Sequence, residues 1–349
     1  MKQSNKMPQH MPETIGIDLG DKVSRYCIVT SNGEVVEEGS FRNQISSIEK
    51  HFSGEPRRIA LEAGAQSAWI SRQLKQLGHE VIVANTRELK WITSCDTKND
   101  PGDARKLALL ARADVRLLAP VEHRTAEQQA ELALIRARDA ILRARTLLIN
   151  MARGIAKGFG MRLPKSITGT FGQRAVEGLP EFLTTALNGV LEQIDALSRQ
   201  ISQYDHQIGQ AAVRHPEVKL LESVPGVGTL TALTFRLTLG RAERFAHSRD
   251  VAGFLGLRPK QRQSGERDPQ LGISKSGDPY LRKLLVQCSH YILGHWGPDS
   301  ALRRWGLSKA AGGKNATLKA IIAVARKLAV LLHRLWVTGE FYKPFPQMG

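Results

Sequence analysis

Short apolar runs alternate with turn residues over the first 85 positions of the chain. The runs predict strands over 14–20, 25–31, 33–41, 57–62 and 79–85. Asn32-Gly33, between the second and third runs, indicates a tight hairpin turn. A helical pattern over 65–77, ended by Gly78, separates the last two strands. Strands in hairpin order, followed by strands that alternate with a helix, predict a mixed α/β sheet.

The pattern becomes helical near residue 126 and stays so to about 215. One block repeats an apolar residue every seven positions, at Leu134, Ile141, Leu148 and Ile155. A second block alternates steps of three and four, at Leu187, Val190, Ile194, Leu197, Ile201, Tyr204 and Ile208. A glycine-rich stretch over 158–172 predicts a loop between them. These helices could form a hairpin, a coiled coil with a partner chain, or part of an ordinary helical bundle.

A third segment, from about 216 to the end, is also mainly helical. Pro225-Gly226-Val227-Gly228 separates two predicted helices, and three more are predicted over 279–292, 299–308 and 315–336. The turn matches a helix-hairpin-helix, in which the amides around Gly226 and Gly228 would bind a phosphate, although a plain helix–helix turn fits equally well. We therefore divide the chain into 1–125, 126–215 and 216–349.

Charge is distributed unevenly along these segments. The formal net charge is +17, and residues 216–349 contribute 21 Lys and Arg against 9 Asp and Glu. Such an excess favours a polyanionic partner, with nucleic acid as the first choice and a merely solvated surface as the alternative. The densest basic stretch, expected to bind nucleic acid, contains Arg258, Lys260, Arg262, Arg267, Lys275 and Arg282.

Other compositional features narrow the setting of the protein. Its three cysteines, Cys27, Cys95 and Cys288, do not suggest a disulfide framework, and no C-x-x-C spacing suggests zinc. The first residues lack the apolar segment of a signal peptide, and no apolar stretch approaches the ~20 residues of a membrane helix. We expect a cytoplasmic protein with no membrane partner.

Four acidic residues fall where predicted elements begin or end. Asp18 and Glu62 end two strands, and Asp100 and Asp103 lie at the start of a helix. Carboxylates that converge repel one another unless a cation neutralises them, and oxygen ligands without His or Cys favour Mg²⁺ or Mn²⁺. Two such ions would suit phosphoryl transfer. Each acid also has an ordinary explanation, since Asp100 and Asp103 fit helix capping and the other two could simply end strands.

Serines in the basic stretch are candidate nucleophiles. Ser264, Ser274 and Ser276 each lie near glycine and among arginines and lysines, although a turn serine bonded to its own backbone is the more common case. IGIDLG, around Asp18, also resembles the first phosphate loop of actin-like kinases and ATPases. That interpretation needs a second phosphate loop, and the sequence contains none that matches.

Taken together, the motifs resemble the DEDD transposases of the insertion sequence 110 family, from end to end. IGIDLG, LEAGA and NDPGDARKLA look like the segments that carry that family's four acids, and GISKSGDPYLRKLL is similar to its 1111-like subgroup. The resemblance implies a RuvC-like, RNase H-type domain, a coiled-coil spacer and a C-terminal transposase domain. It also implies Mg²⁺ bound by Asp18, Glu62, Asp100 and Asp103, with Asp96 a weaker rival for the third acid.

The same resemblance implies how such a protein would act. Ser264, in Gln-Ser-Gly, would be the nucleophile that forms a phosphoserine link with DNA. A bridge RNA encoded by the element would pair with target and donor DNA, and dimers would assemble into tetramers, in a bacterial cytoplasm near the nucleoid. Two alternatives stay open: a RuvC-like junction nuclease that uses water, and a nucleic-acid-binding protein without activity.

Overall fold

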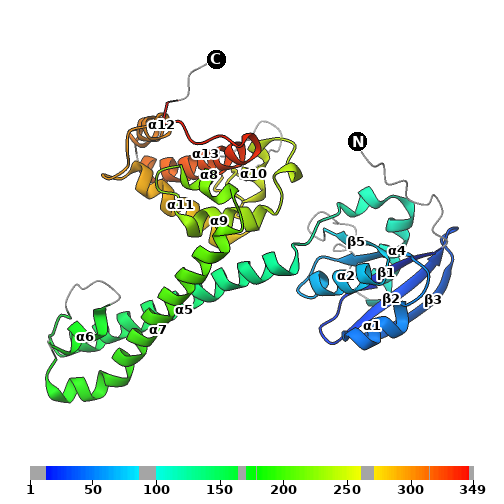
Figure 1. The fold of residues 1–349 in the computed structure, drawn as a ribbon, viewed down its shortest axis with the longest axis horizontal. Helices are drawn as coiled ribbons and strands as arrows, with labels where there is room; N and C mark the ends of the chain where they lie inside the picture. The colour runs from blue at the N-terminus through cyan, green and yellow to red at the C-terminus, as the bar shows by residue number, and fades with distance from the viewer. Residues whose placement is uncertain are drawn as a thin grey trace. The chain divides into compact units, whose positions relative to one another are not determined.

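The chain folds as two compact units, Met1–Ala126 and Glu127–Gly349 (Figure 1). The computed structural model describes residues 13–85, 100–163, 170–177, 179–260, 271–313 and 315–345. It leaves out the side chains of residues 100 and 101 as well. Each unit has apolar cores of its own. The helices of 126–215 and those after 216 therefore belong to one unit, while the division into three functional domains stays a prediction.

The first unit is built on a five-stranded sheet in the order β3-β2-β1-β4-β5. Its strands β1, β2 and β3 form an antiparallel meander, and β4 and β5 run parallel to β1. The prediction of a mixed α/β sheet is confirmed, and the arrangement is consistent with a RuvC-like domain. The strands are β1 (Glu13–Asp18), β2 (Val23–Thr30), β3 (Val35–Arg42), β4 (Arg58–Glu62) and β5 (Glu80–Ala84).

Helices cover both faces of this sheet. On one face, α1 (Ile45–Phe52) and α2 (Ser67–Gln76) pack against Ile15, Ile17 and their neighbours in a buried cluster. On the other, α4 (Asp100–Ala113) packs against small residues such as Ala60, and a 3-10 turn, η1 (Val115–Leu118), follows it. The sequence pattern did not indicate α1, because this eight-residue helix buries only two side chains.

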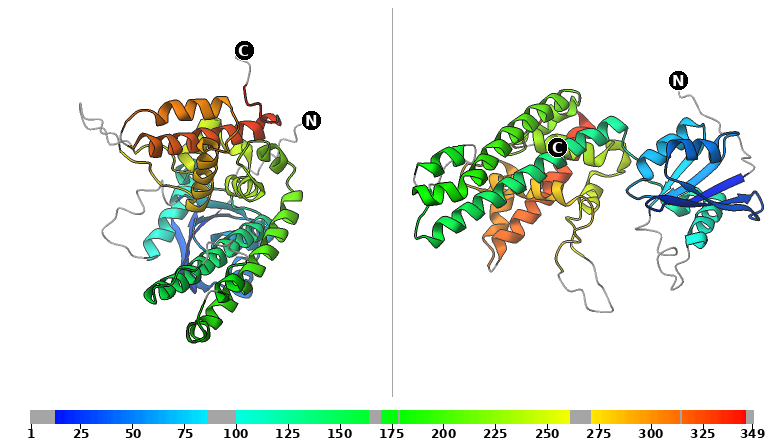
Figure 2. Two further views of the ribbon diagram at one scale, coloured as in Figure 1. Left: turned by 90° about the vertical axis from the view of Figure 1, so that its left-hand side faces the viewer. Right: turned by 90° about the horizontal axis from the view of Figure 1, so that it is seen from below.

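The second unit begins with two long helices, α5 (Ala126–Gly158) and α7 (Glu181–Val213), of 33 residues each. Figure 2 shows these green helices side by side. They are antiparallel, since Arg138 Nε lies 2.5 Å from Asp205 Oδ1 and Arg145 Nη1 lies 3.2 Å from Ser198 Oγ. We call the pair the helical arm. A short helix, α6 (Phe171–Val176), begins within the stretch predicted to be a loop.

The apolar repeat of α7 is only partly used within the arm. Its seven-residue series is buried, at Leu187, Ile194, Ile201 and Ile208. The alternate positions Val190, Leu197 and Tyr204 are half-buried, whereas Leu191 and Ser198 are buried in their place. The helices thus pair within one chain, and a coiled coil between chains stays a prediction.

The remaining helices surround α13 (Ala316–Thr338), which packs against α8, α10, α11 and α12. Capping fits the local sequence, because Asp278 accepts from the amides of Tyr280 and Leu281 and Ser300 accepts from that of Arg303. Within the described part of the chain, no helix is both long and apolar enough to cross a membrane. The helices of the second unit that accompany α13 are α8 (Glu217–Glu222), α9 (Thr229–Leu239), α10 (Ser248–Phe254), α11 (Pro279–Leu293) and α12 (Ala301–Ala310).

Candidate active site and nucleic-acid interface

Two of the four predicted acids lie at the ends of neighbouring parallel strands. The register pairs Ile17 of β1 with Leu61 of β4, so Asp18 and Glu62 follow side by side. Side chains alternate between the faces of a sheet, so these two share the face of Gly16 and Ala60. That is the face covered by α4. The structure therefore brings both carboxylates to one edge, under one helix.

The approach of α4 to the sheet depends on Gly16. A Cβ atom at this position would lie 1.9 Å from the carbonyl oxygen of Ala104 and 2.5 Å from the amide nitrogen of Ala108. Only glycine permits so close a contact between helix and strand. No local sequence pattern indicates this contact, because it depends on a helix about 90 positions further along the chain.

The direction of α4 brings its first turn toward the acids. Arg112, near its end, donates to the carbonyl of Ser31, just after β2 and next to the start of β1, at 2.8 Å. The helix therefore runs opposite to β1, and its N-terminus lies near the end where Asp18 and Glu62 stand. Positive potential at a helix N-terminus favours negative groups there.

The side chains described at this edge form only part of the predicted metal site. Asp103 is half-buried and accepts an ion-pair hydrogen bond from Lys106 at 3.0 Å. Among the described side chains, no three Asp, Glu, His or Cys residues form a group that could hold a metal ion. Asp100 is placed by its backbone alone, and Asp96 lies outside the described residues. The site as described can thus supply carboxylate oxygens, but not a closed ligand set.

One cation near this edge was not anticipated. Arg25 is the register partner of Asp18 on β2, and it shares its face with Cys27 and α4. Hairpin register, read back from Asn32-Gly33, is the signal that could have found it. Its guanidinium group therefore starts from the same face of the sheet as the carboxylates of Asp18 and Glu62.

We call residues 261–270, which include Ser264, the serine segment, and we call the two described stretches that flank it, 253–260 and 271–278, its legs. Their backbones pair through Pro259 and Ile273, and the amide of Lys260 donates to Gly272 at 2.9 Å. The Ser274 and Ser276 hydroxyls lie 3.0 Å apart. Ser264, Arg262 and Arg267 lie outside the described residues. The legs therefore locate both ends of the segment that carries the predicted nucleophile.

Four of the predicted phosphate-binding cations lie among the described residues, and these four fall into two groups. Arg258 donates to Asp250 at 3.1 Å, and Arg282 donates to the carbonyls of Leu255 and Ser276, so both brace the legs. Lys260 and Lys275 are exposed. The two lysines are free to reach a polyanion, whereas the two arginines also support the structure.

The glycine turn lies between α8 and α9, as the sequence suggested. Gly226 has a φ of +88°, and a Cβ there would lie 2.6 Å from the ring of Tyr291. Gly228 precedes α9, and a Cβ on it would meet open space. Glu222 accepts from the hydroxyl of Thr229 in the first turn of α9. A phosphate at this turn would have to coexist with that carboxylate.

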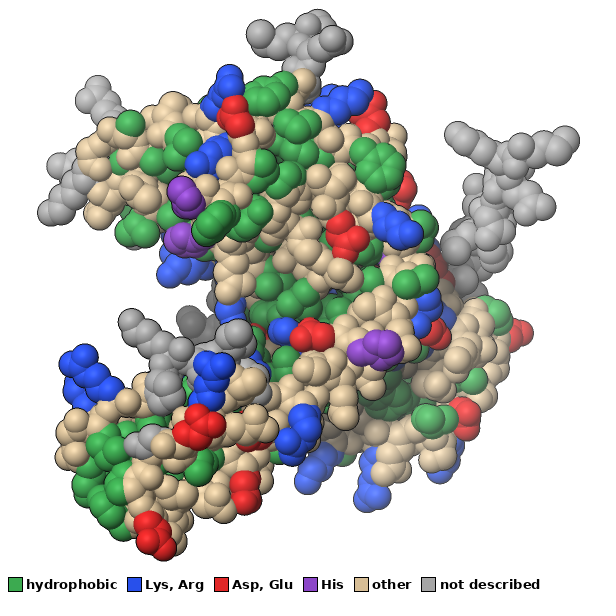
Figure 3. All heavy atoms as spheres, turned by 60° about the vertical axis from the view of Figure 1, so that its left-hand side comes forward, with side chains coloured by type: hydrophobic (Ala, Val, Ile, Leu, Met, Phe, Trp, Pro, Cys, Tyr) green, Lys and Arg blue, Asp and Glu red, His purple; other side chains and the backbone are tan. Residues whose placement is uncertain are grey.

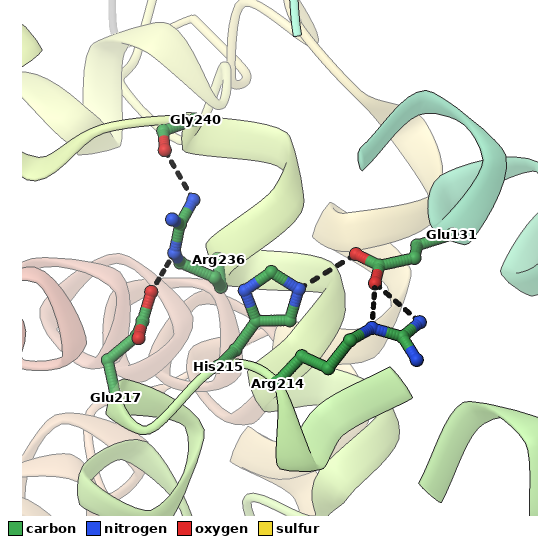
Figure 4. A network of polar contacts seen from close by, with 6 residues as sticks. All are labelled: Glu131, Arg214, His215, Glu217, Arg236 and Gly240. Carbon is green, nitrogen blue, oxygen red and sulfur yellow. Dashed lines mark hydrogen bonds and ion pairs between the residues drawn. The ribbon is translucent and has the colours of Figure 1, made fainter. Parts of the chain in front are cut away.

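A buried ionic network joins the arm to the C-terminal helices (Figure 4). Glu131 of α5 accepts from Arg214 Nη2 and from His215 Nε2, each at 2.7 Å. Nearby, Arg236 of α9 pairs with Glu217 and donates to the carbonyl of Gly240. Burial lowers the pKa of the Arg236 guanidinium. The network fixes both ends of the arm at one place.

Comparisons with known proteins agree with this architecture. A family model described as "Transposase IS116/IS110/IS902 family" matches residues 218–303, and a DEDD transposase model for IS110 elements matches 15–160. The chain is 28% identical to the transposase for insertion sequence element IS1111A of Coxiella burnetii, over 94% of this chain and 91% of that protein.

Two further relatives extend the comparison. The transposase for insertion sequence element IS1328 of Yersinia enterocolitica is 29% identical, over 80% of this chain and 83% of its own. A putative transposase, y4pF/y4sB, of Sinorhizobium fredii is 30% identical, over 94% of this chain and 86% of its own. With the sheet edge and these matches taken together, the chain belongs to the IS116/IS110/IS902 family of insertion-sequence transposases.

Proposed function

We propose that this transposase exchanges DNA strands through a phosphoserine intermediate, with Asp18, Glu62, Asp100 and Asp103 holding Mg²⁺ or Mn²⁺. The observation that carries the proposal is the meeting of two strand ends and one helix start at a single sheet edge. Oxygen ligands alone suit these hard cations. Asp103, now paired with Lys106, would exchange that partner for the ion.

The chain's own residues would do the remaining work at this edge. A divalent cation supplies Lewis-acid stabilisation of charge on phosphate oxygens. Strands β1 and β4 hold Asp18 and Glu62 at a fixed spacing, because each acid directly follows the last residue pair that joins these two strands. Arg25, on the neighbouring strand, would add positive charge beside the scissile phosphate.

Ser264 would provide the nucleophile. Its hydroxyl loses a proton as its oxygen bonds to phosphorus, and the bond from phosphorus to the 3′ oxygen of DNA breaks, with that oxygen taking up a proton. The 3′ hydroxyl of the partner strand then attacks the same phosphorus and releases the serine. Every phosphoester bond broken is replaced by another, so no ATP is needed. Arg262 and Arg267, two and three residues away, would neutralise the phosphate.

Guidance by an element-encoded bridge RNA completes the proposal. Base pairing of this RNA with target and donor DNA would supply the choice of sequence, so the protein would need to hold only the backbone. The excess of 21 basic over 9 acidic residues after position 215 supports a polyanionic partner of this kind. Sequencing of RNA that copurifies with the protein tests this part directly.

We also propose assembly into dimers and tetramers, because the acids and Ser264 belong to different units of the chain and must meet. Exposed apolar side chains at the tip of the arm support a contact between chains (Figure 3). Phe159 and Phe182 there are 59% and 62% exposed, and their ring centroids lie 5.7 Å apart.

A DNA substrate that traps covalent intermediates tests the chemistry. We expect the natural protein to form a protein–DNA adduct and Ser264→Ala to form none. Ser274→Ala and Ser276→Ala are the matched controls, and both should retain the adduct. An adduct with Ser264→Ala would move the nucleophile elsewhere, and cutting by the natural protein without any adduct would favour a nuclease that uses water.

A further inference from the structure

A large groove in the second unit has no role in the function proposed so far. Its volume is about 1300 Å³. The walls are one side of α13, the helix α12, the chain end over 340–344 and the legs of the serine segment at Leu257, Pro259 and Ile273. All of these elements lie within one compact unit.

The groove is lined by apolar and by basic side chains, which we call its floor and its rim. Ile322, Ala323 and Val330 of α13 contribute to the floor, together with Leu302 of α12. One lining side chain is acidic, Glu340. Seven are basic: Arg249, Lys275, Lys319, Arg326, Lys327, Arg334 and Lys343. A lining that combines apolar side chains with several cations suits an anion with flat, apolar parts.

Aromatic rings line the groove as well. Trp305 is half-buried, with Lys327 Nζ 4.0 Å from the centre of its ring. Phe341 is 62% exposed. The chain end that carries Phe341 and Tyr342 is fixed on both sides, since Tyr342 N donates to Ser223 and Ala301 N donates to Pro344, each at 2.9 Å. The rings are therefore held in place for contact with a flat group.

We propose that this groove binds an unpaired DNA strand next to the bond that is cut. The cations would meet the phosphates, and the bases would lie on the apolar floor and the aromatic rings. The legs of the serine segment form one wall, so the strand would contact the described residues that flank Ser264 in the sequence. The choice of DNA rests on the proposed function, in which Ser264 attacks a DNA strand.

Paired DNA fits the groove less well than a single strand. In a duplex the faces of the bases are stacked on one another, so phosphates alone could contact the protein. Such contacts would use the basic rim and leave the apolar floor unfilled. The floor is thus the feature that selects an unpaired strand.

The test measures binding of the full chain to a labelled oligothymidine of twelve nucleotides. A chelator removes divalent cations, so that no strand is cut. We expect Arg326→Glu to weaken binding about ten-fold. Lys309→Glu, an equal charge change on an exposed residue of α12 outside the groove lining, should weaken it less than about two-fold. Equal losses in the two variants would overturn the proposal.

Two further comparisons test the floor and the kind of strand. Oligothymidine should bind at least about five-fold more tightly than an abasic strand of equal length. Leu318→Ser with Phe341→Ser, both more than half exposed, should remove that preference without harming the fold. Equal binding of the two strands, or tighter binding of oligouridine than of oligothymidine, would contradict the proposal.

The adduct assay separates this inference from the proposed function. If the protein forms the Ser264 adduct but Arg326→Glu binds oligothymidine normally, the groove inference fails while strand exchange stands. If oligothymidine binding follows the groove variants but no adduct forms, the groove inference stands and the phosphoserine proposal fails.

Discussion

The two compact units differ in how their charges are arranged. In the first, residues 1–120 contain 17 basic and 15 acidic residues, and Asp18 and Glu62 stand side by side at one sheet edge. In the second, seven basic residues and one acidic residue contribute to the lining of a largely apolar groove. A balanced surface with a local acidic edge suits bond chemistry, whereas a basic surface suits holding a polyanion. The two tasks should therefore be separable by substitution.

The largest effect should come from the sheet edge. Asp18→Ala and Glu62→Gln each remove a carboxylate from the proposed metal site, and several kcal/mol of charge stabilisation would be lost. We expect strand cleavage to fall by about a thousand-fold or more, with nucleic-acid binding largely unchanged. Cleavage in Mg²⁺ measures the first quantity and gel shifts the second.

Glu49→Gln is the matched control for Glu62→Gln, because Glu49 is exposed on α1 and should be neutral. Normal cleavage by Asp18→Ala would show that the acids of the first unit are not the catalytic ones.

The second effect concerns the ionic network of the second unit. Glu131→Ala leaves His215 and Arg214 without their buried partner, and should cost about 3 kcal/mol in the free energy of unfolding. Urea unfolding of the chain, followed by a signal from the second unit, measures the loss. Glu192→Ala, at an exposed position of α7, should change it by less than about 0.5 kcal/mol. A similar small change for Glu131→Ala would mean that the network is not needed for stability.

A smaller effect is the expected difference in DNA affinity between the two units. A fragment of residues 127–349 should bind DNA about ten-fold more tightly than 1–126 at equal salt, and with the steeper salt dependence. Filter binding at several salt concentrations measures both. Equal affinities and slopes would remove the contrast drawn between the units.

The smallest effect is the pH dependence of stability that Tyr26 adds to the first unit. Burial, together with a hydrogen bond to Glu37, raises the pKa of Tyr26 from 10.0 to about 12. Because the folded state favours the protonated phenol, its contribution is complete below pH 10 and is lost as pH rises toward 12. Tyr26→Phe should therefore flatten the fall in stability between pH 10 and 12, measured by urea unfolding. An unchanged slope would show that Tyr26 is not its source.

The sequence predicted the sheet and the family well, and the reason lies in local pattern. Alternating apolar runs and Asn32-Gly33 were enough to predict the strands, and Asp18 and Glu62 are visible as strand ends. The sequence pattern did not predict helix α1, nor that Leu191 rather than Val190 is buried in the arm, since both depend on packing against other elements.

Long-range contacts explain what else was missed. The contact of Gly16 with Ala104, and that of Glu131 with His215, join residues more than 80 positions apart. No local pattern encodes such pairs, because the partner of a side chain depends on the path of the whole chain. The position of α4 over the acids, on which the candidate site depends, is therefore visible only in the fold.

The helical arm has a consequence for how such proteins can change in length. Its contacts Arg138–Asp205 and Arg145–Ser198 lie seven residues apart on each helix. Removing or adding seven residues in both helices together would shift the tip by roughly 10 Å and leave every remaining pair in register. The arm can thus be lengthened or shortened in matched steps, while the Glu131 network at its base stays as it is.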